Sequence, residues 1–441
     1  MTLLFGRRSL AGFVGVLLPA LAWAQTPAYE NWNAKFQATY VWQFKPSFAA
    51  AYSGPNSLSP ERAKSYSFTA TAALGFRPWT GGELYFDPEV AQGVPLSNLT
   101  GLGGFTNGEM ARASGSNPTF YRARLFLRQS WDMGGSSEQM ESDANRLAGA
   151  VDKRRVVLTA GNLSVLDIFD NNAYSHDPRR QFLNWAFLTY GAYDYAGDAR
   201  GYTWGAALEY FYDNWAVRAG RFIQPKEPNQ LSLDSRIFEH YGDQIEIERG
   251  HTWGDQPGVL RILVFRNRAL MSRFDNALDL AARTGTTPDI NAVRTEEQVK
   301  TGIGINLEQL IQPDVGVFSR AMWADGQTET YAFTEIDRSL SAGALLKGGA
   351  WGRPHDSVGV ALARNELSHA HRDYLGAAGL GFFIGDGRLN YRPENIVEVF
   401  YSLGACKSSW VTLDAQRIQN PAYNADRGPV HIATLRVHAE F

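Results

Sequence analysis

The C-terminal end of the chain alternates strictly between apolar and polar side chains. The apolar positions are Ala433, Leu435, Val437, Ala439 and Phe441, and the polar positions between them are Thr434, Arg436, His438 and Glu440. A period of two residues indicates a β-strand whose two faces meet different environments. One face in lipid, one face on a polar lumen and a terminal aromatic residue are typical of the last strand of an outer-membrane β-barrel.

The same alternation recurs along the chain, interrupted by stretches rich in Gly, Pro, Asn and Asp. We predict strands near residues 34–44, 65–77, 82–88, 119–131, 155–164, 201–212, 215–223, 243–253, 259–268, 299–307, 315–324, 339–348, 357–364, 394–403, 411–419 and 430–441. This is an all-β fold: a transmembrane antiparallel β-barrel of sixteen strands, with long extracellular loops and short periplasmic turns. One periplasmic segment, residues 132–153, is longer than the other turns and is predicted to carry a short helix.

The N-terminus has the anatomy of a secretory signal. Arg7 and Arg8 precede an apolar run at 10–22, and Ala22-Trp23-Ala24 forms the cleavage site. The alternative is a membrane anchor, but the run is shorter than the ~20 apolar residues that a spanning helix needs. We therefore expect a signal peptide at 1–24 and a single barrel domain at 25–441.

Composition narrows the function. The chain has 441 residues, a formal net charge of −3 and a single cysteine, Cys406. This weak charge gives no reason to expect a nucleic acid partner, and one cysteine provides neither an internal disulfide nor a metal cluster. Ser175, His176 and Asp177 are adjacent in sequence, so they cannot stack in line as a catalytic triad. We predict that the protein is not an enzyme and needs no cofactor.

Two groups of residues could in principle bind a metal ion, but neither has the pattern of a metal site, so we predict that no metal is bound. Asp167, Asp170, Asn171 and Asp177 offer oxygen ligands but miss the regular spacing of a calcium loop. His369 and His371 lack an evident third ligand, so a pair of surface histidines is favoured over a metal site.

Charged residues indicate which face of a strand points into the lumen. In the strand at 119–131, Arg122, Arg124 and Arg128 share a face with Phe120 and Phe126. Each arginine near the bilayer midplane would cost ~2–4 kcal/mol on the lipid face, so this face is predicted to point inward. The same argument predicts inward carboxylates on two other strands, namely Glu83, Asp87, Glu246 and Glu248.

Such a wall has the chemistry to handle sugars. Sugar hydroxyls both donate and accept hydrogen bonds, which guanidinium and carboxylate groups match. Aromatic rings such as that of Phe126 cover the apolar face of a pyranose. The alternative is that charge is a general property of a water-filled lumen. A constriction ring is the more specific interpretation, because only residues at the narrowest point set selectivity.

The third outer loop carries a long charged stretch at 167–184, which includes Arg179 and Arg180. Long ordered loops are often functional. We expect this loop to fold inward, narrow the pore and bring both arginines close to the arginine wall. The alternative is a loop that only shapes the mouth of the barrel.

Several segments resemble the carbohydrate-selective porin (OprB) family. They are VLDIFDNNAYSHDPRRQFLNW at 165–185, YDYAGDARGY at 193–202, PKEPN at 225–229, YGDQIEIE at 241–248, WGRPHDSVG at 351–359, HRDYLGAAGLGFFIGDGRLNY at 371–391 and NPAYNADRGPVHIATLRVHAEF at 420–441. The resemblance implies a sixteen-stranded channel in the bacterial outer membrane that passes glucose and other small sugars by diffusion.

The expected partners are sugars as permeants, outer-membrane lipid around the barrel, and the outer-membrane assembly machinery acting on Phe441. Association into a homo-oligomer stays open. The alternative function is a general or plugged outer-membrane barrel, which would be structural or non-selective. A barrel enzyme is disfavoured because the outer loops offer no convincing set of nucleophile, base and orienting residue.

Overall fold

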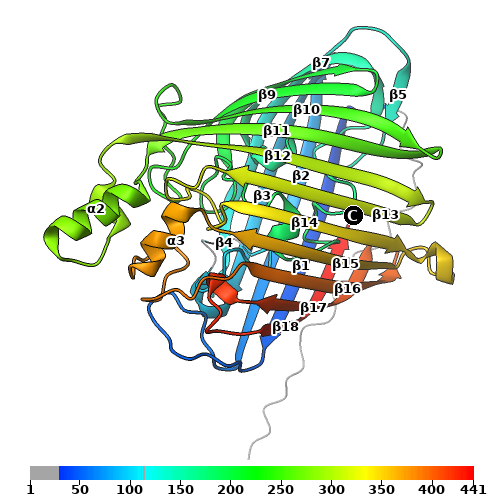
Figure 1. Ribbon diagram of the computed structural model, residues 1–441. Coiled ribbons are helices and arrows are strands. Elements are labelled where there is room, and N and C mark those ends of the chain that lie inside the picture. Colours follow the sequence, from blue (N-terminus) through cyan, green and yellow to red (C-terminus); the bar gives the residue numbers. More distant parts are fainter. Residues whose placement is uncertain (1–28, 111, 113–114) are drawn as a thin grey trace, which may run out of the picture.

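The computed structural model describes residues 29–110, 112 and 115–441. The predicted signal peptide at 1–24 lies outside the described residues. Within the part of the chain that is described, sixteen strands close into one antiparallel barrel, and two more form a small separate hairpin (Figure 1). The sixteen-stranded barrel predicted from alternation is confirmed.

The strands of the barrel are β1 Trp32–Lys45, β2 Ala63–Trp79, β3 Gly82–Val94, β4 Thr119–Asp132, β7 Arg154–Leu163, β8 Thr203–Tyr212, β9 Trp215–Ile223, β10 Tyr241–Trp253, β11 Gln256–Leu270, β12 Glu297–Gln312, β13 Val315–Ala324, β14 Arg338–Lys347, β15 Ser357–Glu366, β16 Glu394–Cys406, β17 Ser409–Gln419 and β18 Val430–Glu440. The separate hairpin consists of β5 Ser137–Met140 and β6 Gly149–Asp152. The helices are α1 Trp185–Leu188, α2 Phe274–Thr284 and α3 His369–Gly376, with 3₁₀ turns η1 Leu96–Leu99, η2 Val165–Asp167, η3 Ile290–Val293, η4 Gly348–Trp351 and η5 Pro421–Tyr423.

The first and last strands close the barrel. β1 pairs with β18 in a register that sets Gln37 opposite Glu440 and Phe44 opposite Ala433. The ladder continues to the end of the chain, because the N–H of Phe441 donates to the carbonyl of Phe36 at 2.8 Å. Closure pairs the backbone groups that an open sheet edge would leave unsatisfied in lipid.

Two predicted strands are clearly too short. The strand predicted at 299–307 is β12, which runs from Glu297 to Gln312. The prediction ended the third strand at residue 88, whereas β3 continues through Pro88 to Val94. Pro88 lies at a shift in the register between β3 and β4, and irregularities of this kind are where a sheet tolerates proline.

The predicted helix in the periplasmic segment 132–153 is wrong. The segment contains the hairpin β5–β6, in which Ser137 pairs with Asp152 and Met140 with Gly149. Its connection is tied to the barrel, since the Asn33 side chain donates to the carbonyls of Asp143 and Arg146. Such tertiary contacts override the weak helical propensity of a short segment.

The outer surface of the strands is apolar. On β10 and β11, Ile245, Ile247, Ile262 and Val264 point outward and are between 40% and 50% exposed. In the membrane this surface is covered by lipid, which favours apolar side chains on one face of each strand. Among the described residues, no helix is long and apolar enough to cross a membrane.

Loops at the extracellular end fold inward and pack an aromatic core. Trp185 stacks on Phe333 with ring centroids 4.9 Å apart, and Phe105 meets Phe383 edge-on at 5.0 Å. These four rings come from different loops, and all are buried. The hydrophobic core of the protein therefore includes loop residues inside the barrel, while α2 and α3 lie beyond the strand ends (Figure 1).

Candidate functional site: the lumen of the barrel

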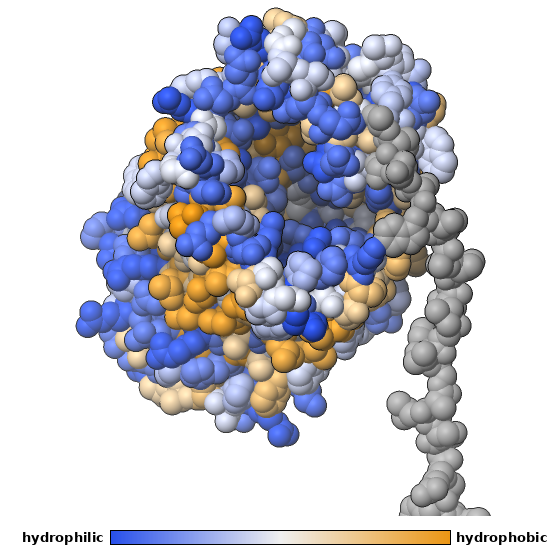
Figure 2. All heavy atoms as spheres, turned by 90° about the vertical axis from the view of Figure 1, so that its right-hand side faces the viewer, coloured by the Kyte–Doolittle hydropathy of each residue, from blue (hydrophilic) through white to orange (hydrophobic). Residues whose placement is uncertain are grey.

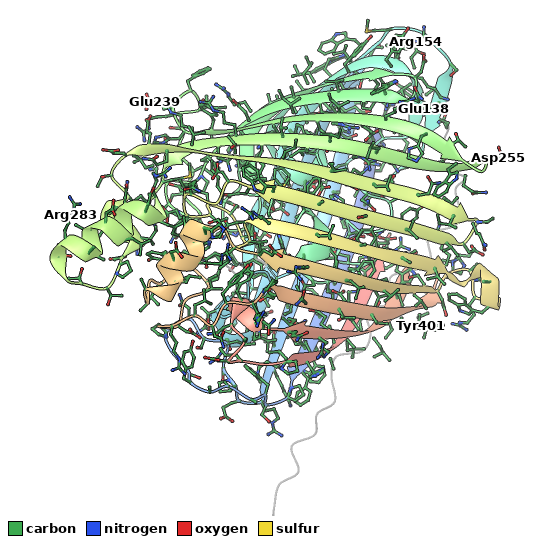
Figure 3. All side chains as sticks on the ribbon, in the orientation of Figure 1. Glu138, Arg154, Glu239, Asp255, Arg283 and Tyr401 are labelled. Atoms are coloured by element: carbon green, nitrogen blue, oxygen red, sulfur yellow. The ribbon has the colours of Figure 1, made fainter. Side chains whose placement is uncertain are left out.

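A cavity of about 920 Å³ lies inside the barrel. It begins at the periplasmic rim, where Lys407 and Phe441 contribute to its lining, and reaches Glu109 and Arg179 deeper in the lumen. Viewed from the periplasmic end, the barrel is hollowed and hydrophilic residues surround the hollow (Figure 2). In Figure 3, Asp255 marks the periplasmic end of the barrel and Arg283 lies at the opposite, extracellular end.

Three inward-facing residue pairs of β3 and β4, each two residues apart along the strands, form one wall of this cavity. In register, Glu83 lies opposite Arg128, Tyr85 opposite Phe126, and Asp87 opposite Arg124. The charged pairs approach to 3.7 Å and 3.4 Å, and the two aromatic rings are 5.0 Å apart. The two carboxylates, the two arginines and Phe126 all line the cavity, as their predicted inward orientation requires. We call this set of pairs the β3–β4 ladder.

Arg122 does not belong to this wall, and its predicted orientation is wrong. Asp87 pairs with Arg124, but the next residue, Pro88, pairs with Arg122, so Ala123 is an extra residue in β4. A bulge of this kind sets two residues against one and shifts the alternation of faces. Arg122 therefore points outward, where its guanidinium lies 5.0 Å from the ring centroid of Trp204.

The third outer loop, residues 164–202, crosses the lumen. The N–H of Asp170 donates to the Glu246 carboxylate of β10 at 2.8 Å. Farther along the loop, the N–H groups of Leu183 and Asn184 donate to Glu398 of β16, and Arg436 of β18 donates to the carbonyl of Pro178. The loop is thus fixed to strands on the far side of the barrel, which is the inward fold expected from its charge and length.

The two arginines of this loop occupy different places. Arg179 lines the cavity and forms ion pairs with Glu109 at 2.8 Å and with Glu89 at 3.5 Å. Arg180 does not line the cavity; it pairs with Glu440 at 2.8 Å and stacks on Trp410. Arg179 is therefore in a position to meet a permeant within this cavity, whereas Arg180 is connected to the cavity through Glu440, which lines it.

Electrostatics at Arg179 favour its charged form. Burial opposes the charge, but the carboxylates of Glu109 and Glu89 hold the pKa of Arg179 above its usual value. Burial raises the pKa of Glu109, and its contacts with Arg179 and the Thr69 hydroxyl offset part of that effect. The loop arginine is thus a permanent positive charge beside the lumen.

Loop residues also join the β3–β4 ladder. The carboxylate of Asp167 accepts two hydrogen bonds from Arg124, at 2.6 Å and 2.7 Å. Asp170 instead pairs with Arg320 of β13 at 2.9 Å. Two of the acidic residues considered as calcium ligands are therefore paired with separate arginines, while the Asp177 carboxylate accepts a hydrogen bond from the backbone N–H of Arg179 at 2.8 Å.

Glu246 and Glu248 face inward but do not line the cavity. The Glu246 side chain is fully buried, and it pairs with Arg218 at 3.0 Å beneath the inward loop. Glu248 pairs with Arg218 and Arg261 at 3.0 Å and 2.7 Å. The prediction of Glu246 as a pore-lining residue is wrong, because the loop covers it and separates it from the cavity. Glu248 keeps a partly exposed side chain outside the lining of this cavity.

Some lining residues escaped sequence analysis. Arg77 and Glu209 line the cavity from β2 and β8; extending the alternation argument to those strands would have identified both. Asn145 and Arg146 line it from the periplasmic segment, for which alternation gives no signal. His371, expected on the surface, is buried in α3 and bonds Asp337 at 3.0 Å.

A closed barrel with an apolar outside, a charged cavity and an inward-folded loop defines a class of protein, the outer-membrane diffusion channels or porins. The family model described as "Carbohydrate-selective porin, OprB family" matches residues 58–441. The chain belongs to this family and is an outer-membrane porin for carbohydrates. The fold and family are those of channels rather than enzymes.

Solved structures share the fold at low sequence identity. The high-pH structure of OprB from Pseudomonas putida is 14% identical, with a TM-score of 0.68 over 93% of this chain and 94% of that one. The outer-membrane channel DcaP of Acinetobacter baumannii is 9% identical, with a TM-score of 0.53 over 96% of this chain and all of the other. No curated protein sequence shows significant similarity to the chain.

Proposed function

We propose that this porin selects small neutral sugars at the β3–β4 ladder and Arg179. The observation that carries the proposal is one wall of the cavity on which a pair of aromatic rings lies between two pairs of opposite charges. Because each arginine has a carboxylate beside it, the wall offers many hydrogen-bonding groups with little net charge. Sugars gain donors and acceptors there, whereas a single ion gains less than it would beside an unpaired charge.

Aromatic side chains add a second element of recognition. Tyr85 and Phe126 lie between the two charged pairs of the ladder, and Arg128 lies within 5.4 Å of the Phe126 ring centroid. A pyranose has an apolar face of C–H groups that packs on aromatic surface. The ladder thus combines apolar and polar contacts. Its rows are two residues apart along each strand, which corresponds to about 7 Å.

The test is liposome swelling with the purified protein, comparing glucose with gluconate, which is of similar size but charged. We expect faster swelling in glucose. Equal rates would indicate a general porin, and no swelling in either solute would indicate a plugged barrel; either result rejects the proposal. Protein-free liposomes give the background rate.

We also propose that Phe441 is the residue that the outer-membrane assembly machinery recognises. It ends the closing strand, its backbone pairs with Phe36, and its side chain is 72% exposed. Deleting Phe441 should reduce the fraction of heat-modifiable, folded barrel in outer membranes while the purified variant still refolds in detergent. Normal assembly in cells would reject this role.

A further inference from the structure

We propose that the periplasmic segment 133–153 forms an inner constriction of the pore and that Asn145 at its tip is a specificity-determining residue. This inference rests on the proposed function of the β3–β4 ladder, which it deepens. Most other periplasmic connections are tight turns, such as Asp213-Asn214 between β8 and β9, and the connection at 348–356 contains only the 3₁₀ turn η4. The segment between β4 and β7 instead folds back against the lumen.

The tip of the segment contacts the ladder directly. The carbonyl of Asn145 accepts a hydrogen bond from Arg128 at 2.9 Å, and its side-chain amide donates to Asp87 at 2.8 Å. The N–H of Leu147 donates to the Tyr85 hydroxyl at 3.1 Å. One short stretch therefore engages all three rows of the ladder.

This stretch also meets the open space of the pore. Residues 142–147 line the cavity together with the ladder and Arg179. Asn145 has φ of +57°, a left-handed conformation that asparagine tolerates better than most residues. In this conformation the Asn145 carbonyl bonds Arg128 and the side-chain amide bonds Asp87. Asn145 therefore determines which atoms of Asp87 and Arg128 remain available to a permeant.

The segment is anchored on both sides of the ladder. On one side, the Asn33 amide of β1 donates to the Ser142 hydroxyl and to the carbonyls of Asp143 and Arg146, at 3.0–3.2 Å. On the other side, Glu138 of β5 pairs with Arg155 of β7 at 3.3 Å; Figure 3 shows Glu138 at the periplasmic end. In the barrel, β2, β3 and β4 lie between β1 and β7.

These anchors give the segment a defined place. Because they span the β2–β4 wall, the segment lies across that wall and not beside the barrel. A permeant leaving the ladder toward the periplasm therefore passes the stretch 142–147. The outer loop with Arg179 and the periplasmic segment would restrict the pore from opposite ends.

The main test replaces residues 138–151 with Asn-Gly, a favoured hairpin turn. The remaining ends are already aligned, because Ser137 pairs with Asp152 and Lys153 N–H donates to the carbonyl of Ser136. We expect single-channel conductance to rise about twofold or more, as it does when a narrow section is removed, and sucrose to enter liposomes faster relative to glucose. Unchanged conductance and unchanged sucrose exclusion in a folded, heat-modifiable barrel would overturn the inference.

Point variants keep the inference testable if the deletion fails to fold. Ala144→Trp adds bulk at a cavity-lining position and should lower conductance. Asn145→Gly keeps the backbone carbonyl and permits the positive φ, but removes the amide from Asp87; it should reduce the preference for glucose over gluconate with little change in conductance. Glu141→Gln, an exposed residue outside the lining, is the matched control and should behave like wild type.

The outcomes separate this inference from the proposed function. If wild type prefers glucose but Ala144→Trp and Asn145→Gly both behave like wild type, the inner constriction is rejected and the ladder proposal stands. If wild type itself shows no preference, the proposed function is rejected. In that case a changed conductance of Ala144→Trp would still support the constriction.

Discussion

Two walls of the lumen carry similar charges but place them in opposite surroundings. On β2, β3 and β4 the charged side chains border the open cavity. On β10, β13, β16 and β18 the side chains of Glu246, Arg320, Glu398 and Arg436 are almost completely buried under the inward loop. We call these the open wall and the covered wall. An inward position in a barrel strand therefore does not by itself make a residue part of the pore.

The difference follows from what each wall binds. Open-wall groups pair with each other across neighbouring strands, as Asp87 does with Arg124. Covered-wall groups bind the backbone of the loop: Glu398 accepts from Leu183 and Asn184, and Arg436 donates to the carbonyl of Pro178. A buried charge is costly unless it is paired and hydrogen-bonded. The covered wall depends on the loop for these bonds, whereas the open wall is paired mainly across neighbouring strands, with Asp167 of the loop added at Arg124.

The largest effect is expected from Asp170→Ala, which removes the loop residue that pairs with Arg320 of the covered wall. Both side chains of the Asp170–Arg320 pair are fully buried, so the variant leaves an uncompensated charge that costs about 3–5 kcal/mol. The free energy of unfolding in urea should fall by that amount, and the released loop should increase conductance. The control is Asp213→Ala, which breaks a pair with Arg154 whose side chains are about 40% exposed; solvent screens such pairs, so the loss of stability should be much smaller. Equal losses in the two variants would contradict the comparison.

A smaller effect is expected from neutralising one glutamate on each wall. The open-wall variant should change the ion selectivity, and the covered-wall variant should change the stability. Glu83→Gln removes a negative charge from the cavity lining, so the reversal potential in a salt gradient should shift toward anion selectivity. Glu246→Gln removes a charge that the loop separates from the cavity, and the reversal potential should stay unchanged while stability falls. Equal shifts for the two variants would show that both walls face the permeating ions.

The most local comparison uses two arginines on the same strand. Arg124→Ala leaves Asp87 and Asp167 without their shared cation, so we expect a shift toward cation selectivity and slower glucose entry into liposomes. Arg122→Ala changes a residue that faces outward beside Trp204, and we expect transport and selectivity like wild type. A change in glucose entry for Arg122→Ala would mean that the bulge at Ala123 does not direct this side chain away from the lumen.

The sequence predicted the fold well because a barrel strand repeats one simple rule. Alternation located all sixteen barrel strands, and the charge and length of 167–184 predicted its inward fold. Alternation gave the wrong orientation for Arg122. The extra residue at Ala123 reverses which side chains point inward, and nothing in the composition indicates it. The prediction also failed at Glu246, because alternation distinguishes lumen from lipid but contains no information about a loop that returns from elsewhere in the chain.

The periplasmic segment shows a different limit. Asn145 bonds Arg128 and Asp87, and its neighbours in the segment bond Tyr85 and Asn33. These partners lie on three strands that are separate in sequence. Asn33 reaches Asn145 only through the adjacent carbonyls of Asp143 and Arg146. No local pattern encodes such an arrangement, since it exists only after the strands have paired.

The inward loop has a consequence for the order in which the channel is completed. Its partners Glu398 and Arg436 follow Asn184 and Pro178 by more than two hundred residues. The loop cannot reach its final bonds until the C-terminal strands have joined the sheet. The passage that the loop narrows therefore takes its final form only after the C-terminal strands have completed the perimeter of the barrel.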